Sequence, residues 1–247
     1  MRAGGELNPP STDISRMHNT IRSILTPAAV CIALLAGALG CSNADAAPAL
    51  PSPVGEGPHP VAAAVDTAVF AGGCFWGVEA VFRHVRGVSS SVSGYAGGRG
   101  ANPRYEQVSQ GVTGHAEAVQ VVYDPNVVSY ATLLKVFFSV AHNPTELNRQ
   151  GPDVGTQYRS AVFTRTPEQA GAVKAYIAGL TAASTFREPI VTQVAPLAKF
   201  WAAEPYHQNY LASHRTQPYI VYNDLPKLDA LKKEFPALYR EDGIASK

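Results

Sequence analysis

The stretch Thr67-Ala68-Val69-Phe70-Ala71-Gly72-Gly73-Cys74-Phe75-Trp76-Gly77 joins two kinds of secondary structure and decides the fold. Its first five residues are apolar or β-branched, which is typical of a buried strand, and the two glycines after them favour a tight turn. Apolar residues then recur at the i, i+3, i+4, i+7 spacing of one helix face, at Val78, Val81, Phe82 and Val85. The stretch therefore predicts a strand, a turn that ends at Cys74, and a helix.

The chain on either side of this stretch alternates between strand and helix patterns. Further strands are predicted at residues 88–95, 118–123, 159–164 and 190–194, and further helices at 130–140, 167–183 and 204–213. Ser129 is a predicted cap of the helix at 130, and Thr166 begins a predicted capping box. The leading order, β-α-β-β-α-β, predicts an α+β fold: a ferredoxin-like split βαβ two-layer sandwich. We expect its two long loops, at 96–114 and 142–157, to carry catalytic residues.

Two charged features are predicted to be ordinary surface. Glu79 and Arg83 are four residues apart, so they are expected to pair on the exposed side of the first helix. The tail from residue 218 contains Lys-rich helical turns without a strong pattern. Residues 227–233 are interpreted as a solvated helix face.

The composition excludes several classes of protein. The 247 residues carry 20 Lys and Arg against 19 Asp and Glu, and this balance argues against a nucleic-acid binder. With 46% apolar and 16% charged residues, the chain is expected to be globular. The cysteines, at positions 31, 41 and 74, form no disulfide framework, Cys-rich zinc finger or CxxC motif. We expect no metal site and no bound cofactor.

The first 46 residues resemble a targeting segment rather than part of the fold. An uncharged apolar run at 24–40 follows a short basic lead, as in a secretory signal peptide, and Met17 is a candidate start. Residues 47–64 are rich in Ala and Pro and predict a flexible tether. Residues 65–247 are then the folded domain, which we expect to be a monomer.

Two processing sites compete at the end of the apolar run. Ala44-Asp45-Ala46 is an A-x-A signal for cleavage before Ala47. Ala38-Leu39-Gly40-Cys41 resembles a lipoprotein box that would acylate Cys41, although Ala38 stands where Leu is usual. An uncut membrane anchor ranks below both, because the small residues suit a peptidase. The expected location is the cell envelope: periplasmic, secreted or lipid-anchored, with no other membrane attachment.

Cys74 is the residue whose position suggests chemistry. It lies at a strand-to-helix turn, where free N–H groups and the helix dipole stabilise a negative charge. The sequence therefore predicts an acidified, nucleophilic thiol. The alternative is a buried structural cysteine, which is common in protein cores.

Six ordered blocks resemble the A-type peptide methionine sulfoxide reductases. The first is Gly73-Cys74-Phe75-Trp76-Gly77, which resembles the signature of that family. The others lie at residues 94–98 (GYAGG), 102–105 (NPRY), 114–119 (GHAEAV), 148–160 (NRQGPDVGTQYRS) and 207–211 (HQNYL). The chain departs from the family at Asn143, where HDPT is common, and in having no cysteine after Cys74.

The resemblance implies that Cys74 attacks the sulfur of a methionine (S)-sulfoxide and becomes a sulfenic acid. Glu117 is the implied proton donor, and its neighbours Ala116 and Ala118 suggest burial, which favours the neutral acid. The resemblance assigns three further roles. Tyr105 and Tyr158 would hydrogen-bond the developing oxyanion, Asp153 would be a buried carboxylate that orders water and the thiol, and Phe75 and Trp76 would hold the methyl group of the substrate. His115 and His207 receive no role.

With one thiol left after processing, an internal disulfide cannot form. An external thiol, either a thioredoxin-like protein or a small thiol, is therefore expected to reduce Cys74. The substrates would be oxidised proteins or free methionine sulfoxide. Two alternatives stay open: another Cys-dependent enzyme, such as a thiol peroxidase or a hydrolase with His115 as partner, and a non-enzymatic lipoprotein binding module.

Overall fold

A computed structural model describes residues 50–52 and 65–244. The predicted signal segment 1–46, its candidate lipidation site Cys41, and all but residues 50–52 of the predicted tether lie outside the described residues. These expectations therefore stay predictions. Within the described ranges, none of the helices combines the length and apolar character that a bilayer-crossing helix needs.

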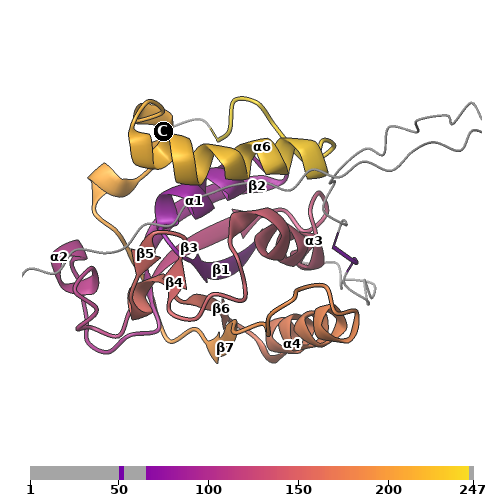
Figure 1. The fold of residues 1–247 in the computed structure, drawn as a ribbon, viewed down its shortest axis with the longest axis horizontal. Helices are drawn as coiled ribbons and strands as arrows, with labels where there is room; N and C mark the ends of the chain where they lie inside the picture. Colours follow the sequence, from indigo (N-terminus) through magenta and orange to yellow (C-terminus); the bar gives the residue numbers. More distant parts are fainter. Residues whose placement is uncertain (1–49, 53–64, 245–247) are drawn as a thin grey trace, which may run out of the picture. The chain divides into compact units, whose positions relative to one another are not determined.

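A mixed sheet forms the centre of the described domain, in the order β7-β6-β1-β3-β2-β8 (Figure 1). Its strands are β1 (Asp66–Gly72), β2 (Val88–Ala96), β3 (Ala116–Tyr123), β6 (Ser160–Thr164), β7 (Gln193–Pro196) and β8 (Phe200–Ala202). The inner four are antiparallel neighbours in the order β6-β1-β3-β2, and β7 joins β6 in parallel. This order of the four strands in the β-α-β-β-α-β unit confirms the predicted split βαβ arrangement.

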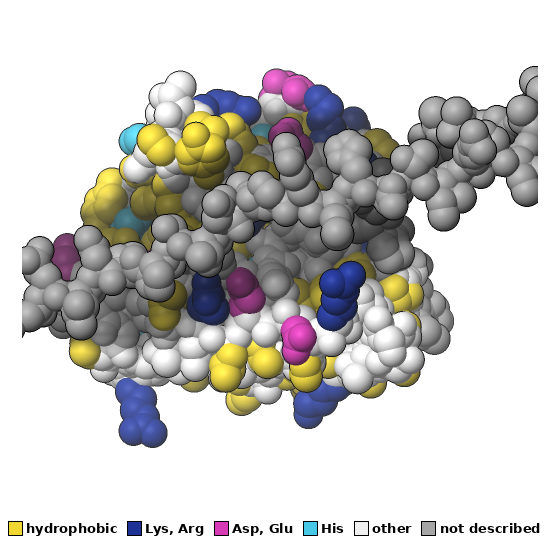
Figure 2. All heavy atoms as spheres, viewed as in Figure 1, with side chains coloured by type: hydrophobic (Ala, Val, Ile, Leu, Met, Phe, Trp, Pro, Cys, Tyr) yellow, Lys and Arg dark blue, Asp and Glu magenta, His cyan; other side chains and the backbone are white. Residues whose placement is uncertain are grey.

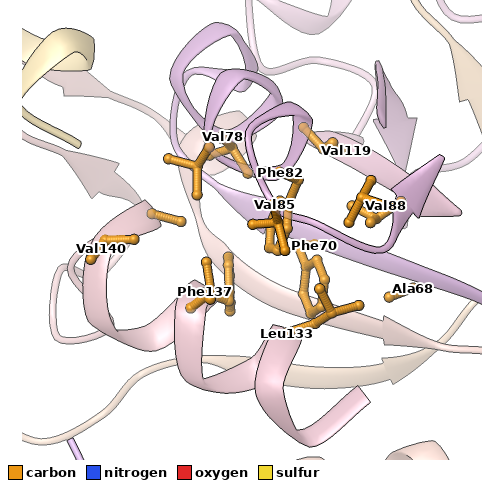
Figure 3. Close-up of a cluster of buried hydrophobic side chains, with 14 of the residues drawn as sticks. Ala68, Phe70, Val78, Phe82, Val85, Val88, Val119, Leu133, Phe137 and Val140 are labelled. Carbon is orange, nitrogen blue, oxygen red and sulfur yellow. The ribbon is translucent and has the colours of Figure 1, made fainter. Parts of the chain in front are cut away.

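The main core lies where two helices cover one face of the sheet. These are α1 (Phe75–Arg83) and α3 (Tyr130–Val136), which continues as the π-helical turn η1 (Phe137–Ala141). Phe70 of β1 stacks on Phe82 of α1 and on Phe137 of η1, with ring centroids 4.9 and 4.8 Å apart (Figure 3). Replacing such a buried Phe by Ala typically costs about 3–5 kcal/mol of stability. This stack fixes α1, and hence Cys74, against the sheet.

Small side chains form a second cluster on the opposite face of the sheet. Because side chains alternate along a strand, Val69 and Ala71 of β1 point away from Phe70 and into this cluster. Its remaining members are Ala96, Ala116, Ala118, Ala161 and Phe163. Leu197 and Phe200 pack against it from the later part of the chain. The strand that leads to Cys74 is thus buried on both faces.

Both predicted helix caps are present. Ser129 Oγ accepts the backbone N–H of Thr132, and Thr166 Oγ1 accepts that of Gln169 at the start of α4 (Pro167–Ala182). Each interaction satisfies a free N–H at a helix N-terminus, and such caps contribute about 1 kcal/mol. The helix boundaries near 130 and 167 are therefore confirmed.

Other details differ from the sequence predictions. The helix expected at 204–213 is broken into η3 (Pro205–His207) and α5 (Tyr210–Ser213), because Asn209 adopts a left-handed conformation with φ +53°. The two long loops contain α2 (Tyr105–Val108) and the hairpin β4 (Arg149–Gln150) with β5 (Asp153–Val154). Strand β8 was not predicted, and β7 begins three residues later than expected.

Glu79 is a further correction. It lies 3.7 Å from Arg83, as expected for that pair, but it is buried rather than exposed. Its carboxylate accepts hydrogen bonds from the hydroxyl of Ser93 and the backbone N–H of Asn209. The carboxylate thus ties α1 to β2 and to the chain before α5.

The C-terminal part of the domain returns to the first helix. It consists of the π-helical segment η4 (Ile220–Asp224) and α6 (Leu225–Glu234), and α6 runs alongside α1 (Figure 1). Leu228 and Leu231 anchor α6 in the core. At the other end of the described chain, Pro51 accepts a hydrogen bond from the hydroxyl of Tyr176 in α4.

The face of the molecule in Figure 2 carries Lys and Arg side chains interspersed with Asp and Glu. Hydrophobic side chains lie between them on the same face. This mixture agrees with the near-neutral net charge of the sequence.

Candidate active site

Cys74 is the N-cap residue of α1, at the place the sequence predicted. Gly73 before it has φ +89°, in the left-handed region that favours glycine, and a Cβ there would lie 2.5 Å from Cβ of Gln150. Only glycine fits this turn, which brings the hairpin residue Gln150 beside Cys74. The cysteine itself is 8% exposed.

The prediction of an acidified thiol is wrong for this arrangement. Burial, followed by the carboxylates of Glu117 and Asp224, raises the pKa of the Cys74 thiol well above its usual value. The backbone N–H of Trp76 and the ammonium of Lys227 act in the opposite direction and are outweighed. The helix start does supply N–H groups, but the first of them, on Phe75, donates to Glu117 rather than to the sulfur.

Glu117 lies on β3 and points at the start of α1. It is 2% exposed, and its Oε2 accepts the backbone N–H of Phe75 at 3.0 Å. Burial raises the pKa of Glu117 to about 8, and the nearby Asp153 and Asp224 add to this effect. A carboxyl group with this pKa carries a proton near neutral pH, which is what a general acid needs.

Tyr105 and Tyr158 both lie near Glu117 and Cys74. They come from two different elements, α2 and η2 (Thr156–Tyr158). Burial raises the pKa of both phenols, that of Tyr105 to about 12, and charges on Glu117 and Cys74 contribute in both cases. Both hydroxyls thus keep their protons at neutral pH and remain hydrogen-bond donors. The backbone N–H of Tyr105 donates to Glu204 at 2.9 Å, which anchors the start of α2.

Asp153 lines a cavity of about 80 Å³ next to Cys74. It is half-buried rather than fully buried as expected, and it accepts a hydrogen bond from the hydroxyl of Tyr219. The other residues that line this cavity are Gln150, Gly151, Pro152, Asn223 and Lys227. The hairpin β4–β5 therefore forms one wall, and the C-terminal segment forms another.

The two aromatic residues after Cys74 have different surroundings. Phe75 is 1% exposed and belongs to the main core, where it packs against Tyr95 and His207. Trp76 is half-buried and stacks on Tyr210 with ring centroids 3.9 Å apart. Trp76 thus has surface left for a ligand, whereas Phe75 mainly supports it.

Sequence reasoning missed several residues of the site. His207, which received no role, accepts the indole N–H of Trp76 through Nδ1 at 3.1 Å. Glu204 accepts hydrogen bonds from the hydroxyl of Tyr95 and from the backbone N–H of Tyr105. Lys227, expected on a solvated face, lines the cavity instead. The four-residue spacing of Tyr219, Asn223 and Lys227 was the available signal, since it marks one face of a helix.

Other candidates are not brought to the sulfur. His115 is buried against Gly98, and it is not among the residues that line the cavity of Cys74. In residues 50–52 and 65–244, no three His, Cys, Asp or Glu residues are grouped so that they could hold a metal ion.

Comparison with known proteins identifies the family. Residues 66–238 match the family model described as peptide methionine sulfoxide reductase. A curated relative from Mesorhizobium japonicum, peptide methionine sulfoxide reductase MsrA 2, is 55% identical over 179 residues, which cover 72% of this chain and 92% of the relative.

Two solved structures agree with this relative. Methionine sulfoxide reductase A of Corynebacterium diphtheriae is 37% identical with a TM-score of 0.55, over 67% of this chain and 92% of that one. Reduced Mxr1 of Saccharomyces cerevisiae is 32% identical with a TM-score of 0.56, over 62% and 87%. The fold, the site and these similarities together show that the chain belongs to the A-type peptide methionine sulfoxide reductase family.

Proposed function

We propose that the protein reduces methionine (S)-sulfoxide, free or in proteins, to methionine at Cys74, with electrons from an external thiol. One observation carries the proposal: the same helix end holds the cysteine and a buried carboxyl group, whose burial favours the protonated form. Cys74 caps α1, and Glu117 accepts the N–H of the next residue. A nucleophile that lines a small cavity and an acid are thereby fixed at the same helix end.

The proposed chemistry uses these groups in sequence. The sulfur of Cys74 attacks the sulfoxide sulfur and loses the thiol proton, while Glu117 transfers its own proton to the sulfoxide oxygen and takes up the proton of the thiol. The hydroxyls of Tyr105 and Tyr158 donate hydrogen bonds to that oxygen as negative charge builds on it. The oxygen then passes from the substrate sulfur to the sulfur of Cys74: the bond between the two sulfur atoms and the S–O bond of the substrate break, and the S–O bond of a sulfenic acid forms. Cys74 is thereby oxidised by two electrons, and the substrate is reduced to methionine.

Three side chains are proposed to hold the substrate and the water of the site. Trp76, held by His207 and Tyr210, would contact the methyl group of the sulfoxide, with Phe75 behind it. Asp153, fixed by the hydroxyl of Tyr219, would order water and the thiol. A flat apolar surface opposite hydrogen-bond donors is the arrangement that a methyl sulfoxide requires.

The return to the thiol is proposed to need two external thiols. The first would displace the sulfenic oxygen as water and form a mixed disulfide, and the second would release Cys74. Cys74 is the one cysteine among the described residues. The reductant is proposed to be a thioredoxin-like protein or a small thiol.

The apolar run at 24–40 and its small-residue exit support a location in the cell envelope. The mass of the mature protein tests this proposal. A chain that starts at Ala47 would support secretion, and an acylated Cys41 would support lipid anchoring. A soluble cytoplasmic protein that retains residues 17–46 would contradict both.

The function itself is tested by comparing wild type with Cys74→Ser on methionine (S)-sulfoxide, hydrogen peroxide and an ester substrate. We expect reduction of the sulfoxide to be lost in the variant. Turnover of peroxide or ester that depends on Cys74 and exceeds sulfoxide turnover would favour a peroxidase or a hydrolase. Sulfoxide turnover above a few per cent of wild type in Cys74→Ser would refute the mechanism.

A further inference from the structure

The C-terminal segment closes the cavity of Cys74 on one side. Tyr219, Asn223 and Lys227 line it together and lie four residues apart: Tyr219 directly before η4, Asn223 in η4, and Lys227 in α6. The hairpin residues Gln150 and Asp153 line the same cavity of about 80 Å³, and Asp153 accepts a hydrogen bond from the hydroxyl of Tyr219. Lys227 brings the one positively charged side chain among the described residues that line this cavity.

Lys227 forms an ion pair with Asp224. Its Nζ lies 3.2 Å from Oδ1 of Asp224, and the carboxylate of Asp224 is fully buried. The second oxygen, Oδ2, is also buried and has no hydrogen-bond partner among the described residues. A buried carboxylate with one free oxygen is costly, so a purely structural ion pair is a poor explanation for it.

The first turn of α1 makes room for this pair. At Gly77 a Cβ atom would lie 2.1 Å from Oδ1 of Asp224 and 2.9 Å from Nζ of Lys227. Gly77 is three residues after Cys74, so the pair is pressed against the helix turn that carries the sulfur. A larger residue at position 77 would push the pair away from the site.

Ionisable groups surround the sulfur from every element packed around it. They are Glu117 on β3, Asp153 on β5, Asp224 at the end of η4, Lys227 on α6, and the phenols of Tyr105, Tyr158 and Tyr219. Three of these groups are carboxyls and one is an ammonium. The two members of the Asp224–Lys227 pair therefore act on Cys74 with opposite sign.

We propose that the Asp224–Lys227 pair sets the reactivity of Cys74. Lys227 stabilises the anionic sulfur of Cys74 during attack on the substrate. Asp224 has two effects: it holds the ammonium of Lys227 against the first turn of α1, and its own negative charge destabilises the anionic sulfur. Both are positioning residues that act through the cysteine. The inference deepens the proposed function and rests on it, because it explains how a buried thiol becomes reactive in that reaction.

The experiment measures the pH dependence of alkylation of Cys74 by iodoacetamide, which needs no sulfoxide. It uses the full chain with Cys31→Ser and Cys41→Ser, so that Cys74 is the thiol observed. Lys227→Met should slow alkylation at neutral pH about tenfold and move the profile to higher pH, by the loss of one nearby positive charge. Lys227→Arg should stay close to wild type.

Asp224→Asn should shift the profile the other way. It removes the buried negative charge, and its amide oxygen can still accept a hydrogen bond from Lys227. We expect alkylation at neutral pH to be faster than in wild type. Lys232→Met is the matched control, because Lys232 lies on the same helix but pairs with Glu241 at the exposed surface.

Opposite shifts in Lys227→Met and Asp224→Asn support the inference. Shifts of the two pH profiles in the same direction, or no shift, overturn it. If the pair were purely structural, the loss of either partner would have the same effect on the alkylation of Cys74. Should Lys227→Met fail to fold, Lys227→Gln replaces it, and folding is checked by thermal unfolding. Opposite shifts without sulfoxide turnover in the wild type would instead refute the proposed function.

Discussion

The carboxylate of Glu117 accepts the backbone N–H of Phe75 at 3.0 Å, so the proposed acid is bound to the residue that follows the proposed nucleophile. This hydrogen bond fixes the position of the carboxyl group of Glu117 relative to the sulfur of Cys74. It also uses the first free N–H of α1, which would otherwise stabilise a thiolate. The site thus favours a protonated Glu117 and does not favour a thiolate at Cys74 in the resting protein.

Glu117→Gln should retain the fold and lose the proton transfer. The amide oxygen of the new residue can accept the N–H of Phe75, but its amide group cannot deliver a proton. We expect the single-turnover rate of methionine formation, measured by rapid quench, to fall by about 10²–10⁴-fold. Glu106→Gln, which changes an exposed acid of α2, should have no such effect. An unchanged rate in Glu117→Gln would transfer the acid role to the tyrosines.

The same substitution should change how stability depends on pH. The pKa of Glu117 is raised from 4.5 to about 8 in the folded protein, so between these pH values the folded state keeps a proton that the unfolded state has lost. Wild-type stability from this group is therefore fully present below pH 4.5 and falls as the pH rises to about 8. Urea unfolding should show Glu117→Gln gaining stability relative to wild type across that window. A constant difference would mean that Glu117 titrates normally.

His207 should influence substrate binding through Trp76. His207→Leu removes the acceptor of the indole N–H, and the loss of such a hydrogen bond is expected to raise KM for the sulfoxide roughly tenfold, with a smaller change in kcat. His207→Asn keeps an acceptor and should restore most of the binding.

Fluorescence gives a second measure of this contact. In a Trp201→Phe background, Trp76 is the remaining tryptophan, and its emission should shift in His207→Leu but not in His207→Asn. An unchanged KM together with unchanged emission would mean that stacking on Tyr210 alone positions Trp76.

Oxidation should stop at the sulfenic acid when no reductant is present. After one turnover the protein should gain about 16 Da and react with dimedone once, at Cys74. Addition of a small monothiol should restore turnover through a mixed disulfide. The variant with Cys31→Ser and Cys41→Ser is the control. An internal disulfide in wild type that is absent from this variant would show that one of those cysteines resolves Cys74.

The sequence predicted the parts of the fold that depend on local patterns. The apolar run in β1, the apolar face of α1 and the caps at Ser129 and Thr166 are all properties of neighbouring residues, and each is confirmed. The break at Asn209 escaped prediction because one left-handed residue interrupts an otherwise helical pattern.

The site was predicted less completely, because its electrostatics depend on distant segments. The position of Cys74 follows from the turn before α1, but its raised pKa depends first on burial and then on Glu117 and Asp224, which lie far away in the chain. Lys227 was misassigned for the same reason. Lysines repeated along a helix indicate a solvated face, and only the packing of α6 along α1 brings one of them into the cavity.

The position of β1 between β6 and β3 has a consequence for how Cys74 is exposed over time. Amides in the middle of a sheet exchange with solvent only through large unfolding events, so those of Val69 and Ala71 should be among the slowest in hydrogen-exchange experiments. The cavity wall formed by residues 219–227 lies outside the sheet and should exchange earlier. Partial opening there would uncover the sulfur while the sheet stays intact, which gives a bulky reductant a route to Cys74 that does not require global unfolding.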